Sequence, residues 1–208
     1  MSVQRNIIET RDLMHCLTPL YVKGRTLDLG AGMAKYRRIF EQNVTEYVTC
    51  DTFAAPHIDV VANAHDLPFE DASFDTVICT MVLEHVQKPW IVAGEIERVL
   101  PSGGHCIIAV PFLFPEHKDP EDYFRYTTAG LASLFPSCST AEVGGYGGIA
   151  ATLDGFFYVG YYDFYRKHHG FFRRNIYRCL KMICHALDRI LPSPPCIYRS
   201  TYFVGKKQ

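Results

Sequence analysis

Three short segments near the start of the chain carry residues suited to binding a nucleoside. Asp28-Leu29-Gly30-Ala31-Gly32 follows an apolar run, and glycines there let a ligand approach the backbone. Asp51 lies about twenty residues beyond the glycines, where a carboxylate accepts hydrogen bonds from a ribose diol. Asn63-Ala64-His65 can present an amide and backbone N–H groups to an adenine edge. With Thr52 and Thr80 beside them, these segments predict a site for an adenosine-containing ligand.

Each segment also has a purely structural interpretation. Asp51 could cap a helix, and Asn63 could be an ordinary turn residue. The prediction of a ligand site therefore depends on the three segments occurring in order, each at the end of a predicted strand.

The predicted elements place these segments along one edge of a sheet. Alternating strands and helices up to residue 110 favour a doubly wound, mainly parallel, seven-stranded Rossmann-like α/β sheet with helices on both faces. The predicted strands are 25–29, 46–50, 57–62, 74–80, 105–110, 139–145 and 197–204. The predicted helices are 3–20, one from about Ala34, 89–100, 127–134, and two within 149–190 broken around Gly170.

The whole of 1–208 is interpreted as a single domain. It comprises an N-terminal helix (3–22), a cofactor-binding core (24–146), a helical aromatic insertion (147–192) and a last strand (197–204). A net charge of −1 gives no argument for nucleic acid as a partner, and the eight cysteines form no CxxC pair. With no signal peptide or spanning segment at the sequence level, a cytoplasmic protein without a metal site is expected.

A longer pattern resembles class I S-adenosylmethionine-dependent methyltransferases, and within them the type 11 group. It covers roughly residues 24–127 and consists of DLGAGMA, Asp51, NAHDLPFEDASFDTVICTMVLEHV and RVLPSGG. The resemblance implies that Asp28, Gly30 and Gly32 surround the methionine part of S-adenosylmethionine, Asp51 holds the ribose, and Asn63 and Ala64 meet the adenine. The chain departs from the pattern in two places: Ala34 stands at the third glycine, and Asn63 replaces the usual aspartate.

The charge of the cofactor agrees with this resemblance. A sulfonium with a nearby ammonium group needs a compensating carboxylate, which Asp28 supplies, whereas a dinucleotide favours the full G-x-G-x-x-G. The third glycine of that motif would fall at Lys35. Two alternatives stay open: a non-catalytic S-adenosylmethionine-binding module, and, with less support, a nicotinamide-dependent oxidoreductase. The chain has a Tyr177-x-x-x-Lys181 pair, but it lies in the basic tail far from the fifth strand, and we interpret its spacing as a coincidence.

Two histidines are the candidate general bases for a methyl acceptor: His85 in the LEH turn, and His117. The loop PFLFPEHKDPEDYFRYT resembles a segment that crosses the acceptor side of the pocket in many bacterial members. That resemblance places Asp122, Tyr123 and Arg125 near a small-molecule, sugar or lipid-linked glycan acceptor. In the competing interpretation, Glu84 and His85 cap a helix, and an Asp122–Arg125 ion pair pins the loop.

The stretch 156–181 combines ten aromatic residues with basic ones, and three interpretations of it stay open. The first in rank is a lid whose aromatics wall the acceptor pocket. The second is a peripheral membrane contact, with an interfacial helix pair on anionic lipid. The third is a homodimer contact. Sequence-specific nucleic-acid binding is not expected, because no RNA-binding motif is present.

Overall fold

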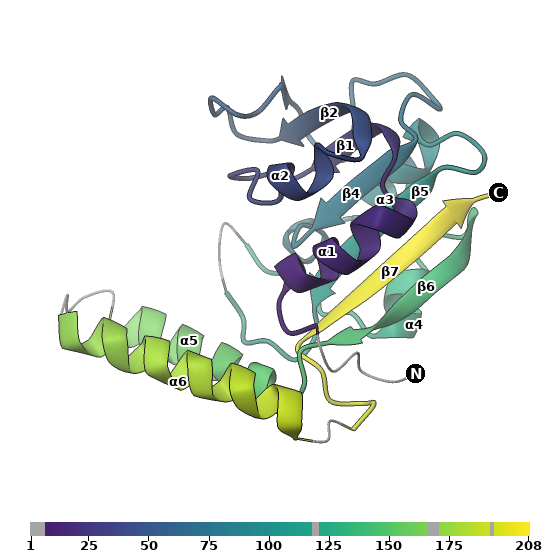
Figure 1. Ribbon diagram of the computed structural model, residues 1–208. Coiled ribbons are helices and arrows are strands. Elements are labelled where there is room, and N and C mark those ends of the chain that lie inside the picture. Colours follow the sequence, from purple (N-terminus) through teal and green to yellow (C-terminus); the bar gives the residue numbers. More distant parts are fainter. Residues whose placement is uncertain (1–6, 118–120, 166–170, 192–193) are drawn as a thin grey trace.

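The computed structural model describes residues 7–117, 121–165, 171–191 and 194–208, and within them one seven-stranded sheet (Figure 1). The strand order is β3-β2-β1-β4-β5-β7-β6, and only β7 runs antiparallel to its neighbours. The bounds are β1 (Gly24–Leu29), β2 (Val44–Asp51), β3 (Val60–Val61), β4 (Thr76–Thr80), β5 (His105–Pro111), β6 (Cys138–Tyr146) and β7 (Ser200–Lys207). The predicted doubly wound, mainly parallel sheet is confirmed.

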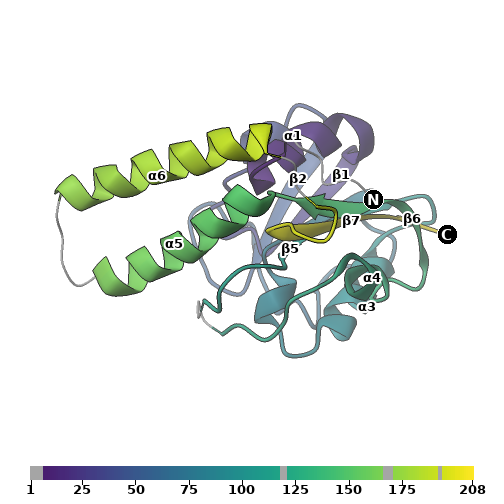
Figure 2. The same ribbon diagram turned by 90° about the horizontal axis from the view of Figure 1, so that it is seen from below.

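Helices cover both faces of this sheet, because its central strands are apolar on both sides. One face carries α1 (Thr10–Tyr21) and α2 (Arg37–Phe40), which pack on Ile78 and Ile107. The other carries α3 (Pro89–Val99) and α4 (Thr128–Ala132), which pack around Leu27 and Leu29 (Figure 2). A 3-10 turn, η1 (Leu83–His85), follows β4.

Two predicted elements are much shorter than expected. The helix expected from about Ala34 is only the four-residue α2, because 31–36 form turns around the glycines. The strand expected over 57–62 is reduced to two residues. Both changes leave backbone in irregular conformations at the carboxyl edge of the sheet, where a ligand can meet it.

A helical hairpin is inserted between β6 and β7. It consists of α5 (Ile149–Tyr165) and α6 (Phe171–Ile190), as predicted, and it projects from the sheet (Figure 1). Buried Asp188 of α6 accepts hydrogen bonds from the N–H groups of Gly148, Ala150 and Ala151, so a carboxylate balances the positive end of α5. Neither α5 nor α6, nor any other helix in the described part of the chain, is long and apolar enough to cross a bilayer.

Candidate active site

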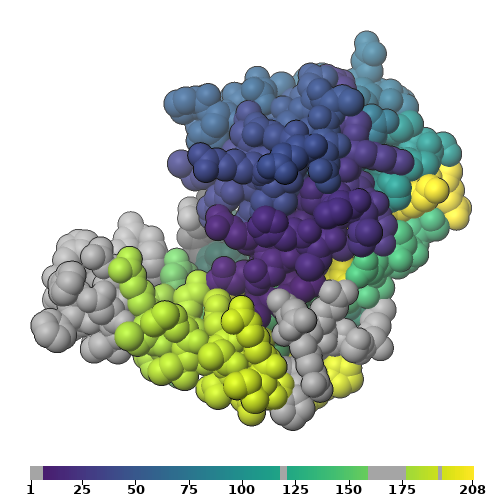
Figure 3. Space-filling model, viewed as in Figure 1, coloured from purple at the N-terminus to yellow at the C-terminus, as the bar shows by residue number. Residues whose placement is uncertain are grey.

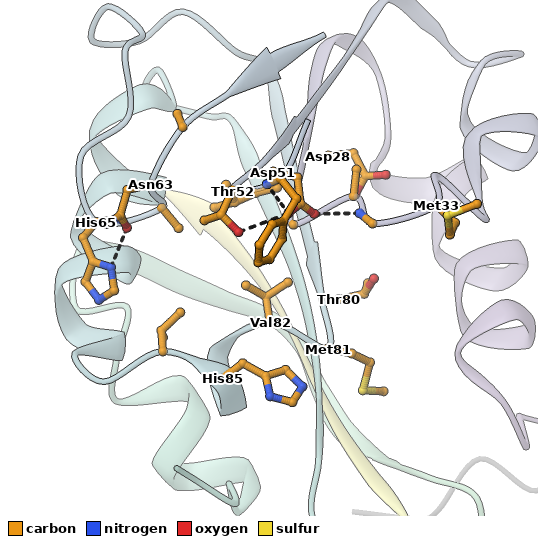
Figure 4. A pocket seen from close by; sticks show the side chains of 18 of the residues that line it. Asp28, Met33, Asp51, Thr52, Asn63, His65, Thr80, Met81, Val82 and His85 are labelled. Atoms are coloured by element: carbon orange, nitrogen blue, oxygen red, sulfur yellow. Dashed lines mark hydrogen bonds between the residues drawn. The ribbon is translucent and has the colours of Figure 1, made fainter. Parts of the chain in front are cut away.

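A cavity of about 770 Å³ lies at the carboxyl ends of β1, β2 and β4 (Figure 4). Its lining includes all ten residues predicted for the cofactor: Asp28, Gly30, Ala31, Gly32, Asp51, Thr52, Asn63, Ala64, His65 and Thr80. His85, His117 and Tyr123 line it as well, whereas Asp122 and Arg125 do not. The structure therefore gathers segments from residue 28 to residue 123 around one space.

The backbone conformation and surroundings of the turn after β1 explain why it contains glycines. Gly30 has a φ of +69°, and a Cβ there would lie 2.2 Å from Val82 Cγ2, so the turn can approach Val82 only without a side chain. Gly32 has a φ of +53°, and its Cβ would meet nothing within 4 Å. Since Gly32 lines the cavity, the space that its missing side chain leaves is open to a ligand.

Ala34, at the third glycine of the pattern, has a φ of 47° and therefore a left-handed conformation that alanine adopts at a cost. We expect Ala34→Gly to raise the free energy of unfolding by up to about 1 kcal/mol, because relief of strain exceeds the added entropy of the unfolded chain. Urea unfolding would measure it, with Ala31→Gly as the control, since Ala31 is not left-handed. Equal changes in the free energy of unfolding at the two positions would contradict backbone strain at Ala34.

Asp51 connects the glycine turn, predicted to surround the methionine part of the cofactor, with the end of β2, predicted to hold the ribose. Its Oδ2 accepts a hydrogen bond from the Gly32 N–H at 2.8 Å, and its Oδ1 accepts from the Phe53 N–H at 3.3 Å. The carboxylate thus holds the glycine turn against the end of β2, and it lies on the cavity wall (Figure 4). Its predicted bond to a ribose stays a prediction.

Asp28 is a buried carboxylate at the floor of the cavity. The Tyr47 hydroxyl donates a hydrogen bond to it, yet burial raises its pKa to about 6, and the negative charge of Asp51 adds to this rise. A carboxylate held out of water with one hydroxyl partner favours a neighbouring cation. This environment suits the ammonium and sulfonium of S-adenosylmethionine better than a phosphate.

Asn63 makes local contacts in the structure. Its Oδ1 accepts hydrogen bonds from the His65 N–H at 3.0 Å and from His65 Nδ1 at 2.8 Å, which closes a turn (Figure 4). The turn interpretation of Asn63 is therefore confirmed, and the residue also lines the cavity. Its predicted contact with the adenine amino group stays a prediction, and both lone pairs of the oxygen are engaged by His65.

The turn after β4 and the loop after β5 form the wall opposite the glycines. The Tyr123 N–H donates to the Glu84 carbonyl at 2.7 Å, and the Tyr126 hydroxyl donates to the Leu83 carbonyl at 2.9 Å. His85 Nδ1 bonds the Glu121 carbonyl. Because a carbonyl only accepts, Nδ1 carries the proton and Nε2 of neutral His85 keeps its lone pair.

Asp122 and Arg125 form a paired unit within this loop. The guanidinium contacts both oxygens of Asp122 and donates to the Phe114 and Pro115 carbonyls at 3.0 and 2.9 Å. Asp122 also accepts the His117 N–H at 2.9 Å. The geometry therefore favours loop pinning for Asp122 and Arg125 over direct substrate contact, and Tyr123 is the member of the predicted trio that reaches the cavity.

His117 and Glu84 flank His85, and the contribution of Glu84 was missed from the sequence. The ring centroids of His85 and His117 are 5.0 Å apart, and Glu84 Oε1 lies 3.7 Å from His85 Nε2. Burial lowers the pKa of His117, whose neutral form can accept a proton, and burial raises the pKa of Glu84 to about 8. These three groups are also close enough to share a metal ion, with ligand atoms within 4.8 Å of one another.

Comparison with known proteins agrees with the geometry. Residues 27–108 match the family model of a methyltransferase domain. An uncharacterized methyltransferase of Mycobacterium sp. (strain JLS) is 32% identical over 109 residues, which cover 47% of this chain and 43% of the relative. The chain spans less than half of the length of the curated relatives it matches.

Solved structures share the fold at low sequence identity. A putative methyltransferase from Bacillus halodurans C-125 superposes with a TM-score of 0.61 at 14% identity, covering 95% of this chain and 98% of that one. Phosphoethanolamine N-methyltransferase 2 of Haemonchus contortus, in complex with S-adenosyl-L-methionine, gives 0.58 at 15% identity, covering 93% and 51%.

Fold and family match together point to one class: residues 27–108 match a methyltransferase domain, and the sheet has the fold of solved methyltransferases. The family match covers less than half of the chain, so it places this segment, and not the whole chain, among class I S-adenosylmethionine-dependent methyltransferases. The cavity fits S-adenosylmethionine, with one buried carboxylate for a cation and an unobstructed glycine turn.

Proposed function

We propose that the protein transfers a methyl group from S-adenosylmethionine to a nucleophile on a small molecule, a sugar or a lipid-linked glycan. The observation that carries the proposal is the shared cavity, in which the cofactor-side residues face a wall bearing two histidines. Bound S-adenosylmethionine supplies an electrophilic methyl group for an in-line displacement. Alignment of the acceptor then accounts for much of the rate.

The residues of the chain divide this work between them. Asp28 balances the positive charge of the cofactor, and Asp51 holds the ribose while it fixes the glycine turn. His85 accepts the acceptor's proton at Nε2, because Nδ1 is held protonated by the Glu121 carbonyl. The carboxyl of buried Glu84 lies 3.7 Å from Nε2. It stabilises the resulting imidazolium when it is ionised, that is, above its raised pKa of about 8. His117 supports or replaces His85 from 5.0 Å away.

Calorimetric titration with S-adenosylmethionine tests the cofactor part of this proposal. We expect affinity to fall as the pH drops below about 6, by up to about tenfold per pH unit, because protonated Asp28 no longer balances the cation. Asp28→Asn should remove this pH dependence.

Asp51→Ala should weaken binding by about 1–3 kcal/mol at every pH. Wild-type binding that is absent, or is insensitive to both substitutions, would overturn the assignment of the cofactor site.

The two alternative functions are separated by different observations. An oxidoreductase would need Tyr177 and Lys181 as a catalytic pair, but the Tyr177 hydroxyl donates to Asp154 and Lys181 pairs with Glu9 at 2.6 Å. These contacts support the interpretation that the spacing is a coincidence. Neither residue lines the cavity. A non-catalytic binding module would bind S-adenosylmethionine without methylating any member of a broad acceptor panel.

A further inference from the structure

The α5–α6 hairpin has two different flanks, which the contacts between its helices define. Asp154 accepts a hydrogen bond from the Tyr177 hydroxyl at 3.3 Å, and the rings of Tyr158 and Tyr177 lie 5.9 Å apart. Asp188 bonds the first amides of α5. These contacts, with the helical spacing, give the seam between the helices: Asp154, Tyr158, Tyr177, Lys181, Cys184 and Asp188.

Among the described side chains, the residues one position before the seam residues are apolar and exposed. They are Leu153, Phe157, Leu180, Ile183 and Leu187, with exposed fractions from 41% to 55%. Two antiparallel helices are related by a twofold axis perpendicular to both. Residues that precede a seam residue by one position therefore lie on the same side of the hairpin in both helices. These five side chains, which we call the apolar face, therefore lie together on one flank of the hairpin.

The body of the protein packs against the other flank. A Cβ at Gly155, one position after Asp154, would lie 2.8 Å from Phe114 Cδ2. His185 Nε2, one position after Cys184, lies 3.9 Å from Glu9 Oε1 and 3.7 Å from Asp154 Oδ2. The α6 helix meets the N-terminal segment at this base in the space-filling view (Figure 3). In Figure 2 both helices lie in front of the body, and no described residue of the hairpin lines the cavity. The described part of the hairpin therefore does not support the lid interpretation; the aromatic and basic side chains of 159–176 lie outside the described side chains.

Charge indicates what covers the apolar face. Segment 149–191 holds seven Lys or Arg against three Asp, in a chain that totals 21 against 22. Two of those three, Asp154 and Asp188, are buried. A second copy would bring two cationic hairpins together, whereas an anionic lipid surface complements both the apolar face and the net positive charge of the segment.

We infer that the hairpin docks on the surface of an anionic lipid membrane through Leu153, Phe157, Leu180, Ile183 and Leu187. The inference does not depend on methyl transfer. It does place the cavity close to a lipid surface, because the hairpin leaves the sheet at the carboxyl edge where the cavity opens. A lipid-linked acceptor would then be delivered beside the site.

Sedimentation with vesicles tests this inference on the full chain. We expect binding to phosphatidylcholine vesicles that contain phosphatidylglycerol, little binding to pure phosphatidylcholine, and weaker binding as salt is raised. Leu180→Ser with Ile183→Ser should weaken partitioning about tenfold or more, and Phe157→Ser should act in the same direction from the other helix. Met182→Ser is the matched control, since Met182 is 64% exposed on the opposite flank and should change binding less than twofold.

Circular dichroism and S-adenosylmethionine titration of each variant establish that fold and cofactor site are intact. Failure of the wild-type protein to bind anionic vesicles would overturn the inference, as would equal losses for Met182→Ser and the double variant. A dimer in sedimentation velocity that dissociates on Ile183→Ser, without vesicle binding, would assign the face to a second copy instead. A wild-type protein that binds the vesicles but does not bind S-adenosylmethionine would count against the proposed function alone.

Discussion

Replacing His85 by glutamine is expected to lower turnover by about 10²–10⁴-fold while S-adenosylmethionine affinity changes less than twofold. Glutamine keeps a polar side chain in the wall of the cavity but cannot accept the acceptor's proton. The Nδ1 bond to Glu121 leaves the lone pair of His85 on Nε2, as a general base requires. Single-turnover kinetics with saturating cofactor would measure the chemical step directly.

His65→Gln is the matched control for this substitution. His65 also lines the cavity, but it lies on the side predicted to hold the adenine and bonds Asn63. His117→Gln separates the two candidate bases, since a larger loss there than at His85 would transfer the role to His117. Wild-type turnover in both variants would remove the histidines from the chemistry. Loss of turnover on EDTA treatment that Zn²⁺ or Mn²⁺ reverses would identify Glu84, His85 and His117 as metal ligands.

Gly32→Asn should weaken cofactor binding by about 10- to 100-fold, corresponding to the 1–3 kcal/mol cost of overfilling a packed site. Asparagine tolerates the left-handed backbone of Gly32, and its Cβ would have no protein atom within 4 Å, so the fold should be retained. It would instead occupy space in the cavity. Titration with S-adenosylmethionine and thermal unfolding, measured on the same samples, separate the two effects.

Gly30→Ala provides the contrast within the same turn. Its Cβ would lie 2.2 Å from Val82, so we expect it to lower the free energy of unfolding by about 1–3 kcal/mol as well as to weaken binding. Equal stability losses at Gly30 and Gly32 would contradict the assignment of Gly32 to the cavity.

The cofactor side of the site could be predicted from the sequence because its signals are local. Glycines, Asp51 and the Asn63 turn each follow a strand, and parallel strands bring their carboxyl ends to one edge. The acceptor side depends on contacts between η1 and a loop nearly forty residues later, 36 residues apart for His85 and Glu121. No periodicity reports such contacts, so the burial of Glu84 emerged only in three dimensions. The Asp122–Arg125 ion pair was one of two sequence interpretations, and only the structure decides between them.

The hairpin raises the same issue for a different reason. Two helices broken around Gly170 were predicted in this long, aromatic and basic segment, but its sequence alone does not say which flank meets the body. That choice is made by side chains far away in sequence, such as Glu9 with Lys181 and Arg199 with Asp154. A lid and an outward-facing surface therefore have the same sequence pattern, and only the contacts of the opposite flank distinguish them.

The pairing of β6 with β7 has a consequence for how this protein can change. Tyr146 is the register partner of Ser200, and the Arg199 N–H donates to the Gly147 carbonyl at 2.6 Å, so the chain leaves and re-enters the sheet at adjacent positions. In the topology of the sheet, the whole insertion takes the place of the turn in a β6–β7 hairpin. A tight turn of a few residues could join the same two strands without altering their register. The insertion, for which we propose a role at a membrane surface, can thus be exchanged as a module, while the strand ends that line the cavity stay unchanged.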